Sequence, residues 1–391
     1  MGAENILIKI KQTLRDSTLH QGKWRANTGQ TSRPIVIAGM FNTANGIGQL
    51  ARTCAETLID AGHAPICIDL SASLNQADMT WDGDLVDRMP ETPGTLILHL
   101  NGPETRHALR TLKLGRWSRW HIIGSWAWEL EHLPTDWASA AVHLDEIWTC
   151  SDFVTQAVRN LSRVPVRTVH PRISIPNVTV NRAQFGLPSD AIICLAAADS
   201  RSSFERKNIL GSVKMFQAAS KNRPNTALIL KTRNLALFPD FQAELQALRN
   251  KDPSIILLDK PLPEELYHSL IASIDIVLSP HRAEGFGFVI AEGMAHGKPV
   301  IATGWSGNTD FMTPDNAIAL PYELVPVSDQ FEIYSQLSER AFWAEPDIDF
   351  GAIKLAHLFD HPQQCLELGK AAAAHMSQHF NGASYAAALN L

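Results

Sequence analysis

The 391-residue sequence contains no hydrophobic run of the about 20 apolar residues that a membrane-spanning helix needs. Its first residues also lack the apolar core of a signal peptide, because Lys9, Lys11 and Arg15 are spread among polar residues. The five cysteines are odd in number and form no Cys-x-x-Cys pair, which favours reduced thiols over a disulfide framework or a zinc site. We therefore expect a cytoplasmic protein.

A strong charge of either sign is also missing. Charged residues make up 19% of the chain and the formal net charge is −6, so the basic surface typical of nucleic-acid-binding proteins is not expected. Hydrophobic residues make up 45%, which argues against long disordered regions. Because the chain is longer than a typical domain, its length predicts two domains, each with a core of its own.

Apolar segments of strand length alternate with segments of helical spacing in both halves of the chain. In the first half we expect strands at 35–38, 64–70, 95–100, 121–124 and 146–150, and helices at 47–61 and 153–161. In the second half we expect strands at 192–198, 227–231, 255–258 and 274–278, and helices at 209–220, 241–249 and 288–296. This alternation predicts an α/β protein with two doubly wound, Rossmann-like parallel sheets.

Four regions follow from this pattern. Residues 1–33 are expected to form a polar leader, 34–172 the first domain and 177–375 the second, with a proline-bounded linker between the domains. Residues 376–391 are expected to form a helix or tail that packs back on the first domain. Ligands of such sheets bind beyond the carboxyl ends of the strands, so we expect the two sheets to face each other across a binding cleft.

The segment with the most functional information is a Gly-Phe-Gly turn between an expected strand and helix, with one glutamate before it and one eight residues later. Glu284 precedes Gly285, Phe286 and Gly287, and Glu292 lies within the helix. The helix N-terminus offers amides and a positive dipole end to a phosphate, and the glycines allow it to approach the backbone. We expect these five residues to bind a nucleotide sugar, with Glu284 on the sugar hydroxyls and Glu292 on the ribose.

Cations follow the strand expected at 192–198. Arg201, Arg206 and Lys207 lie in the connection to the next helix, where they could neutralise a diphosphate. Lys231, at the end of the next strand, is a further candidate for donor binding, although the pattern favours an exposed lysine at a strand end.

The first domain has a glycine loop with two possible meanings. Gly46 and Gly48 fit the G-x-G-x-x-A pattern of dinucleotide-binding proteins, with Asp69 as the distant acid. In that pattern the first glycine follows its strand directly, whereas here residues 41–45 lengthen the loop. The spacing disfavours NAD, and the family resemblance described below implies instead a loop that approaches the donor phosphates or the acceptor from across the cleft.

Polar side chains also follow other expected strands of the first domain. His99 and Glu129 lie at or just after expected strand ends, and we expect both on the acceptor side, with Trp126 and Trp128 nearby for stacking on sugars. Between them lies a basic aromatic stretch that could bind anionic lipid or an anionic acceptor, or could form a solvated helix and loop. Its members are Arg106, Arg110, Lys113, Arg116, Trp117, Arg119 and Trp120.

The second half of the chain resembles the retaining GT-B glycosyltransferases of family 4 (glycosyltransferase group 1), whose E-x7-E motif is matched by Glu284 and Glu292. The resemblance runs from about residue 34 to the end. It includes the stretches 128–130, 204–208 and 342–347, which are similar to a branch found in bacterial polysaccharide clusters. It implies the GT-B fold, in which two Rossmann-like domains enclose a cleft.

The resemblance further implies a metal-independent enzyme that moves a hexose from a nucleotide-diphosphate sugar to a glycan or lipid-linked glycan, in the cytoplasm or at the inner membrane face. The diphosphate would be neutralised by Lys207 together with Arg201 or Arg206, since Ser200 replaces the usual glycine and leaves the choice open. No cofactor is expected, and a mannose donor is weakly favoured. Two alternatives remain, an NAD-dependent oxidoreductase and a non-catalytic sugar-nucleotide-binding partner.

Overall fold

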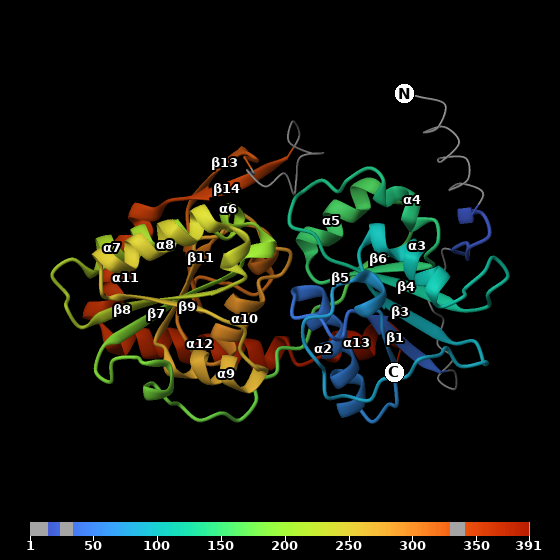
Figure 1. Cartoon of the computed structure of the whole chain (residues 1–391), viewed down its shortest axis with the longest axis horizontal. Helices are drawn as coiled ribbons and strands as arrows, with labels where there is room; N and C mark the ends of the chain where they lie inside the picture. The colour runs from blue at the N-terminus through green and yellow to red at the C-terminus, as the bar shows by residue number, and fades with distance from the viewer. Residues whose placement is uncertain (1–14, 24–33, 329–340, 391) are drawn as a thin grey trace. The chain divides into compact units, whose positions relative to one another are not determined.

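The computed structural model describes residues 15–23, 34–328 and 341–390 (Figure 1). The chain forms two compact units, one made of Met1–Arg172 and Gly382–Leu391 and the other of Ile173–Asn381. Each unit contains a six-stranded parallel sheet with helices on both faces, which confirms the predicted α/β architecture. The expected leader lies largely outside the described residues, at 1–14 and 24–33.

The sheet of unit 1 has the strand order β2-β1-β3-β4-β5-β6, and all neighbouring strands are parallel. In Figure 1 helices α3, α4 and α5 cover one face and α2 and α13 cover the other. Strands covered on both faces are apolar throughout, and all five residues of β3 are buried. The strands are β1 (Ile35–Gly39), β2 (Ile66–Asp69), β3 (Thr95–His99), β4 (His121–Trp126), β5 (Glu146–Thr149) and β6 (Val166–Thr168). The helices are α2 (Gly46–Asp60), α3 (Gly102–Thr111), α4 (Trp137–Ala141), α5 (Asp152–Leu161) and α13 (Ala383–Leu389).

The sheet of unit 2 has the order β12-β11-β10-β7-β8-β9, and a two-stranded antiparallel ribbon, β13 with β14, lies outside it. Figure 1 shows α7, α8 and α11 over one face and α9, α10 and α12 over the other. The strands are β7 (Ile192–Asp199), β8 (Thr226–Arg233), β9 (Ile255–Asp259), β10 (Ile276–Ser279), β11 (Val300–Thr303), β12 (Ile318–Leu320), β13 (Tyr322–Pro326) and β14 (Phe342–Pro346). The helices are α6 (Phe204–Lys207), α7 (Ile209–Ser220), α8 (Pro239–Lys251), α9 (Glu264–Ser273), α10 (Phe288–Ala295), α11 (Ile348–Asp360) and α12 (Pro362–His379).

The start of the fold was expected at residue 34, and this is wrong for residues 15–23, which pack on unit 1. Leu19 forms an antiparallel bridge with Gly115, and its side chain is buried. The imidazole of His20 contacts the carboxylate of Asp145 at 3.2 Å, and both groups are buried. A polar segment without an apolar period is therefore held by backbone pairing and by the buried contact between His20 and Asp145.

The boundary expected at residue 376 falls inside α12 and is corrected to the Asn381–Gly382 junction. The expected polar tail contains the helix α13, which packs on α2 of unit 1. Tyr385 is buried there, with its ring 6.1 Å from that of Trp148. No helix in the described ranges is long and apolar enough to cross a membrane.

Candidate functional site

The order of the strands in unit 2 reverses between β7 and β10, which lie side by side. The connection after β7 continues through residues 200–202 into α6, and the connection after β10 contains residues 280–287 and leads into α10. In doubly wound sheets, ligands bind at the carboxyl ends of the strands at this reversal point. The two segments with the predicted site residues therefore lie where such a sheet binds its ligand.

Glu284 contacts two of the predicted cations directly. Its Oε1 accepts a hydrogen bond from the Nζ of Lys207, and its Oε2 lies 3.3 Å from Nη1 of Arg206. The glutamate is only 7% exposed and Arg206 only 2%. The structure thus brings together three residues that are predicted from two motifs 77 positions apart in the sequence.

The protonation state of Glu284 follows from these neighbours. Burial by itself would raise the pKa of the carboxyl group, but the charges of Lys207 and Arg206 outweigh it and lower the pKa to about 2. Glu284 is consequently an anion at physiological pH, able to accept hydrogen bonds from hydroxyl groups and unable to donate a proton.

The two candidate arginines differ in their surroundings. The guanidinium of Arg206 donates to the backbone oxygens of Ala283 (2.6 Å) and Ser202 (3.0 Å), so it ties the segment after β7 to the segment after β10. The side chain of Arg201 is exposed. The side chain of Arg206 is therefore buried and bonded to the backbone, whereas that of Arg201 lies at the surface of the same connection.

The Gly-Phe-Gly turn has the backbone that its sequence predicts. Gly287 has a φ of +97° at the N-cap of α10, a conformation that favours glycine. A further glycine, Gly307, is required because a side chain there would collide with the backbone of Gly285. Phe286 was expected to contact the donor, but its ring is 3% exposed and packs on other aromatic rings, so only its backbone can face a ligand. Those rings are Phe288, Phe311 and Phe380.

Behind Glu284 lies a buried network that the sequence did not reveal. The Nε2 atom of His281 lies 2.9 Å from Oδ1 of Asn308, and the hydroxyl of Ser306 accepts a hydrogen bond from the backbone N–H of Glu284 at 2.8 Å. The imidazole of His281 is fully buried. These contacts fix the segment that carries Glu284 to the loop after β11.

A second undetected connection links this segment to the β13–β14 ribbon. Arg282 donates to both carboxylate oxygens of Glu345, at 2.5 and 3.1 Å, and its guanidinium also lies 5.5 Å from the ring centre of Trp343. Both partners fall in the stretch 342–347 that carries part of the family resemblance. Because Arg282 is two residues from Glu284, the ribbon helps to position the site.

Glu292 lies in the second turn of α10 and is 4% exposed. The hydroxyl of Tyr267 forms a hydrogen bond with its carboxylate, and burial together with the negative charge of Glu292 raises the pKa of that hydroxyl well above its usual value. Glu292 therefore has a protein partner, Tyr267 of α9. The sequence gives no indication of this contact.

Lys231 is not the exposed strand-end lysine that the sequence allowed. Its side chain is 7% exposed, and Nζ donates to the backbone oxygens of Thr232 (2.9 Å) and Lys260 (2.6 Å). Burial, with a smaller effect of the Arg233 charge, lowers the pKa of Lys231 to about 8. This lysine holds the ends of β8 and β9 together.

Unit 1 has its own reversal point, between β1 and β3. The glycine loop follows β1, His99 is the last residue of β3, and Glu129 lies three residues beyond the end of the neighbouring β4. Gly46, Gly48, His99 and Glu129 thus all belong to the carboxyl edge of one sheet. Glu129 is half-buried.

The glycine loop differs from a dinucleotide site in two respects. Residues 40–45 separate β1 from α2, so the first glycine does not follow the strand. The carboxylate of Asp69 accepts hydrogen bonds from the backbone and side-chain amides of Asn42 and from the Ser71 hydroxyl, at 3.2, 3.1 and 2.6 Å. In a dinucleotide site this carboxylate would bind the ribose, whereas here Asp69 binds Asn42 and Ser71 of the protein itself.

His99 is 1% exposed, and neither of its ring nitrogens has a hydrogen-bond partner among the described residues. Burial lowers its pKa to about 3, so the ring is neutral at physiological pH. Two unsatisfied nitrogens on a buried imidazole are unusual, because most buried polar atoms have a hydrogen-bond partner. Trp126, expected near an acceptor, is instead fully buried against Trp137.

Residues 201–337 match the family model described as "Glycosyl transferases group 1". This segment includes Arg201, Arg206, Lys207 and both glutamates of the motif. No curated protein matches the chain.

Solved structures with the same fold cover both units. A glycosyltransferase from Rickettsia africae is 15% identical, with a TM-score of 0.64 over 92% of this chain and 99% of its own. HepE from Anabaena, solved with UDP-glucose, is 14% identical, with a TM-score of 0.65 over 91% and 98%. Sucrose-phosphate synthase from Thermosynechococcus elongatus is 15% identical, with a TM-score of 0.64 over 92% and 97%.

The fold is therefore GT-B, as the sequence predicts. Together, the fold and the family match support a GT-B glycosyltransferase. The second unit carries the segment that matches the family model, and Glu284 with its two cations lies at the carboxyl edge of the sheet in this unit, at the reversal point.

Proposed function

We propose that this chain is a retaining hexosyltransferase of the family 4 type, which moves a sugar from a nucleotide-diphosphate donor to a glycan or lipid-linked glycan. The observation that carries the proposal is the buried contact of Glu284 with Lys207 and Arg206 at the reversal point of unit 2. It combines an anion for sugar hydroxyls with cations for a diphosphate in one place.

In the proposed reaction the bond between the anomeric carbon and the diphosphate oxygen breaks, and a bond from the acceptor oxygen to that carbon forms on the same face. The proton of the acceptor hydroxyl passes to the departing diphosphate. Lys207, Arg201 and the N-terminus of α10 would stabilise the charge that develops on the diphosphate, an effect typically worth a few kcal/mol for each well-placed group.

Arg201 is the proposed diphosphate ligand because it is exposed, whereas the guanidinium of Arg206 is buried on backbone oxygens. Glu284 would hold the sugar and Glu292 the ribose. In this proposal the cations take the place of a divalent metal. Asp347, the first acid of the sequence Asp347-Ile348-Asp349, caps α11 by accepting a hydrogen bond from the backbone N–H of Phe350 at 2.8 Å.

For the donor we propose mannose carried on GDP, with UDP-glucose as the first competitor because HepE was solved with it. We place the reaction in the cytoplasm and the acceptor on unit 1, near His99 and Glu129. The neutral imidazole of His99 has two unused nitrogens among the described residues, which suits a hydroxyl of a sugar.

The test is a donor screen that detects released nucleoside diphosphate, with mannosyl and undecaprenyl-linked acceptors present. Glu284→Ala should lower turnover at least about 100-fold, since the sugar loses its hydrogen-bond acceptor. Glu264→Ala, an exposed glutamate of α9, is the matched control and should keep full activity. Turnover retained in Glu284→Ala would reject the assignment.

The alternatives give different results in the same screen. An oxidoreductase would be stabilised against heat by NAD and not by GDP or UDP, although the use of Asp69 within its own loop speaks against it. A non-catalytic partner would bind a nucleotide sugar and release nothing with any donor and acceptor.

A further inference from the structure

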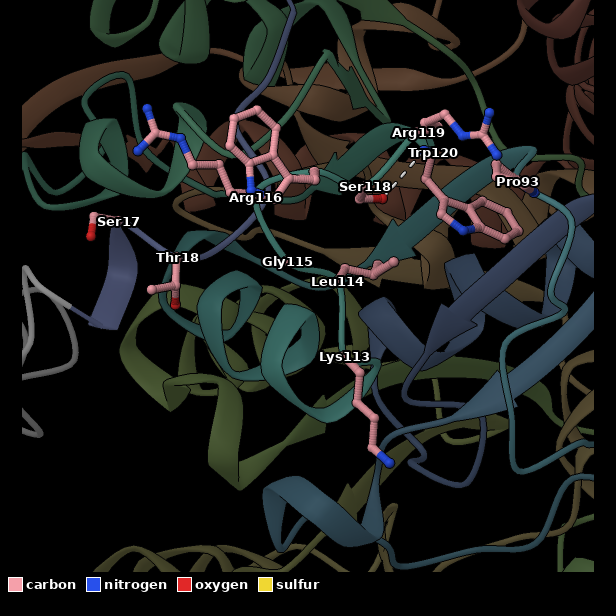
Figure 2. Close-up of a pocket in the computed structure, with 11 residues that line it drawn as sticks. Ser17, Thr18, Pro93, Lys113, Leu114, Gly115, Arg116, Ser118, Arg119 and Trp120 are labelled. Carbon is pink, nitrogen blue, oxygen red and sulfur yellow. Dashed lines mark hydrogen bonds between the residues drawn. The ribbon is translucent and has the colours of Figure 1, made fainter.

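An open hollow of about 800 Å³ lies on unit 1 (Figure 2). Its lining includes Pro93, which shortly precedes β3, and Trp120, which directly precedes β4. His99 and Glu129 lie at the other ends of these two strands. The hollow therefore belongs to the amino edge of the sheet, and it has no part in binding at the carboxyl edge.

The wall of the hollow is a tight turn, Gly115–Ser118, which we call the Trp117 turn. The backbone N–H of Ser118 donates to the oxygen of Gly115 at 2.9 Å, and that of Arg116 donates to Thr18 at 2.7 Å. On either side of the turn, Leu114 and Trp120 are buried. The turn is thus fixed at both ends, and a partner that binds it would not have to order it first.

Trp117 lies at the tip of this turn and is 89% exposed, more than any other large hydrophobic side chain in the described ranges. Folding leaves nearly all of its apolar surface in water. Indole rings are enriched at the boundary between a bilayer and water, because they combine a large apolar face with an N–H donor. An exposed tryptophan on a rigid turn is therefore suited to the headgroup region of a membrane.

Cations flank the tryptophan. Arg116 and Arg119 are exposed, and Figure 2 shows them extending from opposite ends of the turn, while Lys113 points away from both. The guanidinium of Arg116 lies 6.0 Å from the ring centre of Trp117. Bilayers with anionic lipids attract such groups by about 1 kcal/mol for each cation.

Two acids lie near the turn, and they do not cancel this charge. Asp16 is paired with two further cations, Arg106 at 3.6 Å and Arg110. Glu91 is exposed two residues before Pro93. The region is therefore positive on a chain whose formal net charge is −6, so the charge is concentrated at one place.

We propose that the Trp117 turn docks unit 1 on an anionic membrane surface, with the indole among the lipid headgroups and Arg116 and Arg119 on lipid phosphates. A flat surface fits this tip better than a small soluble anion does, since the indole projects from a turn at the rim of an open hollow. The inference does not depend on sugar transfer, because the surface lies at the edge of the sheet opposite the proposed site.

The test is sedimentation of the full chain with phosphatidylcholine vesicles, with and without phosphatidylglycerol. Binding should require phosphatidylglycerol and weaken as salt is added. Trp117→Ala and the double variant R116A/R119A should each bind at least about fivefold more weakly, since 1 kcal/mol corresponds to about fivefold in affinity. The double variant R249A/K251A removes two exposed cations from α8 of unit 2 and should bind like the wild type.

Thermal unfolding of each variant shows that it is folded, and we expect the wild-type midpoint because all three side chains are exposed. Absence of binding to phosphatidylglycerol vesicles would overturn the proposal, as would equal weakening in R249A/K251A. Binding of a soluble acidic oligosaccharide that depends on Trp117, without vesicle binding, would assign the surface to a glycan instead.

Discussion

Glu284 is a buried carboxylate between two cations, and its energetics decide what the site can do. Removing three charges from water is costly, and the mutual attraction of the ions offsets that cost only if the geometry is good. Here Arg206 also donates to two backbone oxygens, so its charge is satisfied on several sides. An ion cluster of this kind keeps Glu284 ionised and fixed in place, as a hydrogen-bond acceptor for a substrate must be.

The dependence of stability on pH provides a test of this cluster. The pKa of Glu284 is lowered in the folded protein, from an ordinary value of 4.5 to about 2. Its contribution is therefore fully present above the unfolded pKa and is lost as the pH falls from 4.5 towards 2. Glu284→Gln should reduce the free energy of unfolding by about 3 kcal/mol at pH 7 and by progressively less below pH about 4.5.

Urea unfolding of the wild type and of Glu284→Gln between pH 7 and 3 measures this difference. Glu264→Gln, exposed on α9, should show no difference at any pH. If the difference in free energy of unfolding between wild type and Glu284→Gln stayed constant from pH 7 to pH 3, this result would contradict the ion cluster.

The two arginines should separate into a binding residue and a positioning residue. Arg201→Ala should reduce kcat/KM for the donor about 100-fold through the diphosphate and change the free energy of unfolding by less than about 0.5 kcal/mol. Arg206→Ala should lower the free energy of unfolding by about 3 kcal/mol, because it removes one of the two cations beside the buried Glu284 and takes a donor from two backbone oxygens. Steady-state kinetics and urea unfolding measure both effects, and an Arg206→Ala variant as stable as the wild type would contradict the assignment.

At the scale of elements, the sequence predicts those strands and helices that are apolar by themselves. β1, β3, β7 and α7 are found within one or two residues of the predicted ranges, because buried parallel strands are continuous apolar runs and helices show their period. The three-residue β12 and the β13–β14 ribbon were missed. Their stability comes from partners distant in the sequence, which no local pattern encodes.

The residues of the candidate site also divide into those that the sequence predicts and those that it does not. Glu284 and Lys207 could be found because each follows a strand, and the topology of doubly wound sheets brings such positions together. The contacts of His281 with Asn308 and of Arg282 with Glu345 could not be found, because they join loops whose course depends on the whole fold. The buried state of Lys231 was missed for the same reason, since its partners are backbone oxygens.

The glycine loop of unit 1 gives a matched pair of variants. A side chain at Gly48 would collide with the backbone oxygens of Thr43 and Met40, whereas at Gly46 it would meet nothing within 4 Å. Gly48→Ala should therefore lower the free energy of unfolding by about 2 kcal/mol. Gly46→Ala should be neutral or stabilising by up to about 1 kcal/mol, since alanine favours the first turn of α2. Urea unfolding measures both, and equal losses in the two variants would show that the loop is held differently.

At the scale of the whole molecule, the chain enters unit 1, forms unit 2 and returns to unit 1 through α13. This return makes the last residues part of the core of the first unit. Tyr385, Ala388 and Leu389 are buried in the same hydrophobic cluster as Trp148. Helix α13 therefore stabilises the unit that does not contain Glu284 and Glu292.

Truncation after Asn381 should consequently destabilise the two units unequally. Loss of the buried side chains of Tyr385 and Leu389 should cost unit 1 about 4 kcal/mol, while unit 2 keeps all its contacts. Differential scanning calorimetry should show one transition moved to lower temperature and one unchanged. The unchanged transition should rise when the nucleoside diphosphate of the donor is added, because a ligand stabilises the unit that binds it. Leu366→Ala, on the exposed face of α12, is the control and should move neither transition. Equal downward shifts of both transitions in the truncated chain would show that α13 does not act on unit 1 alone.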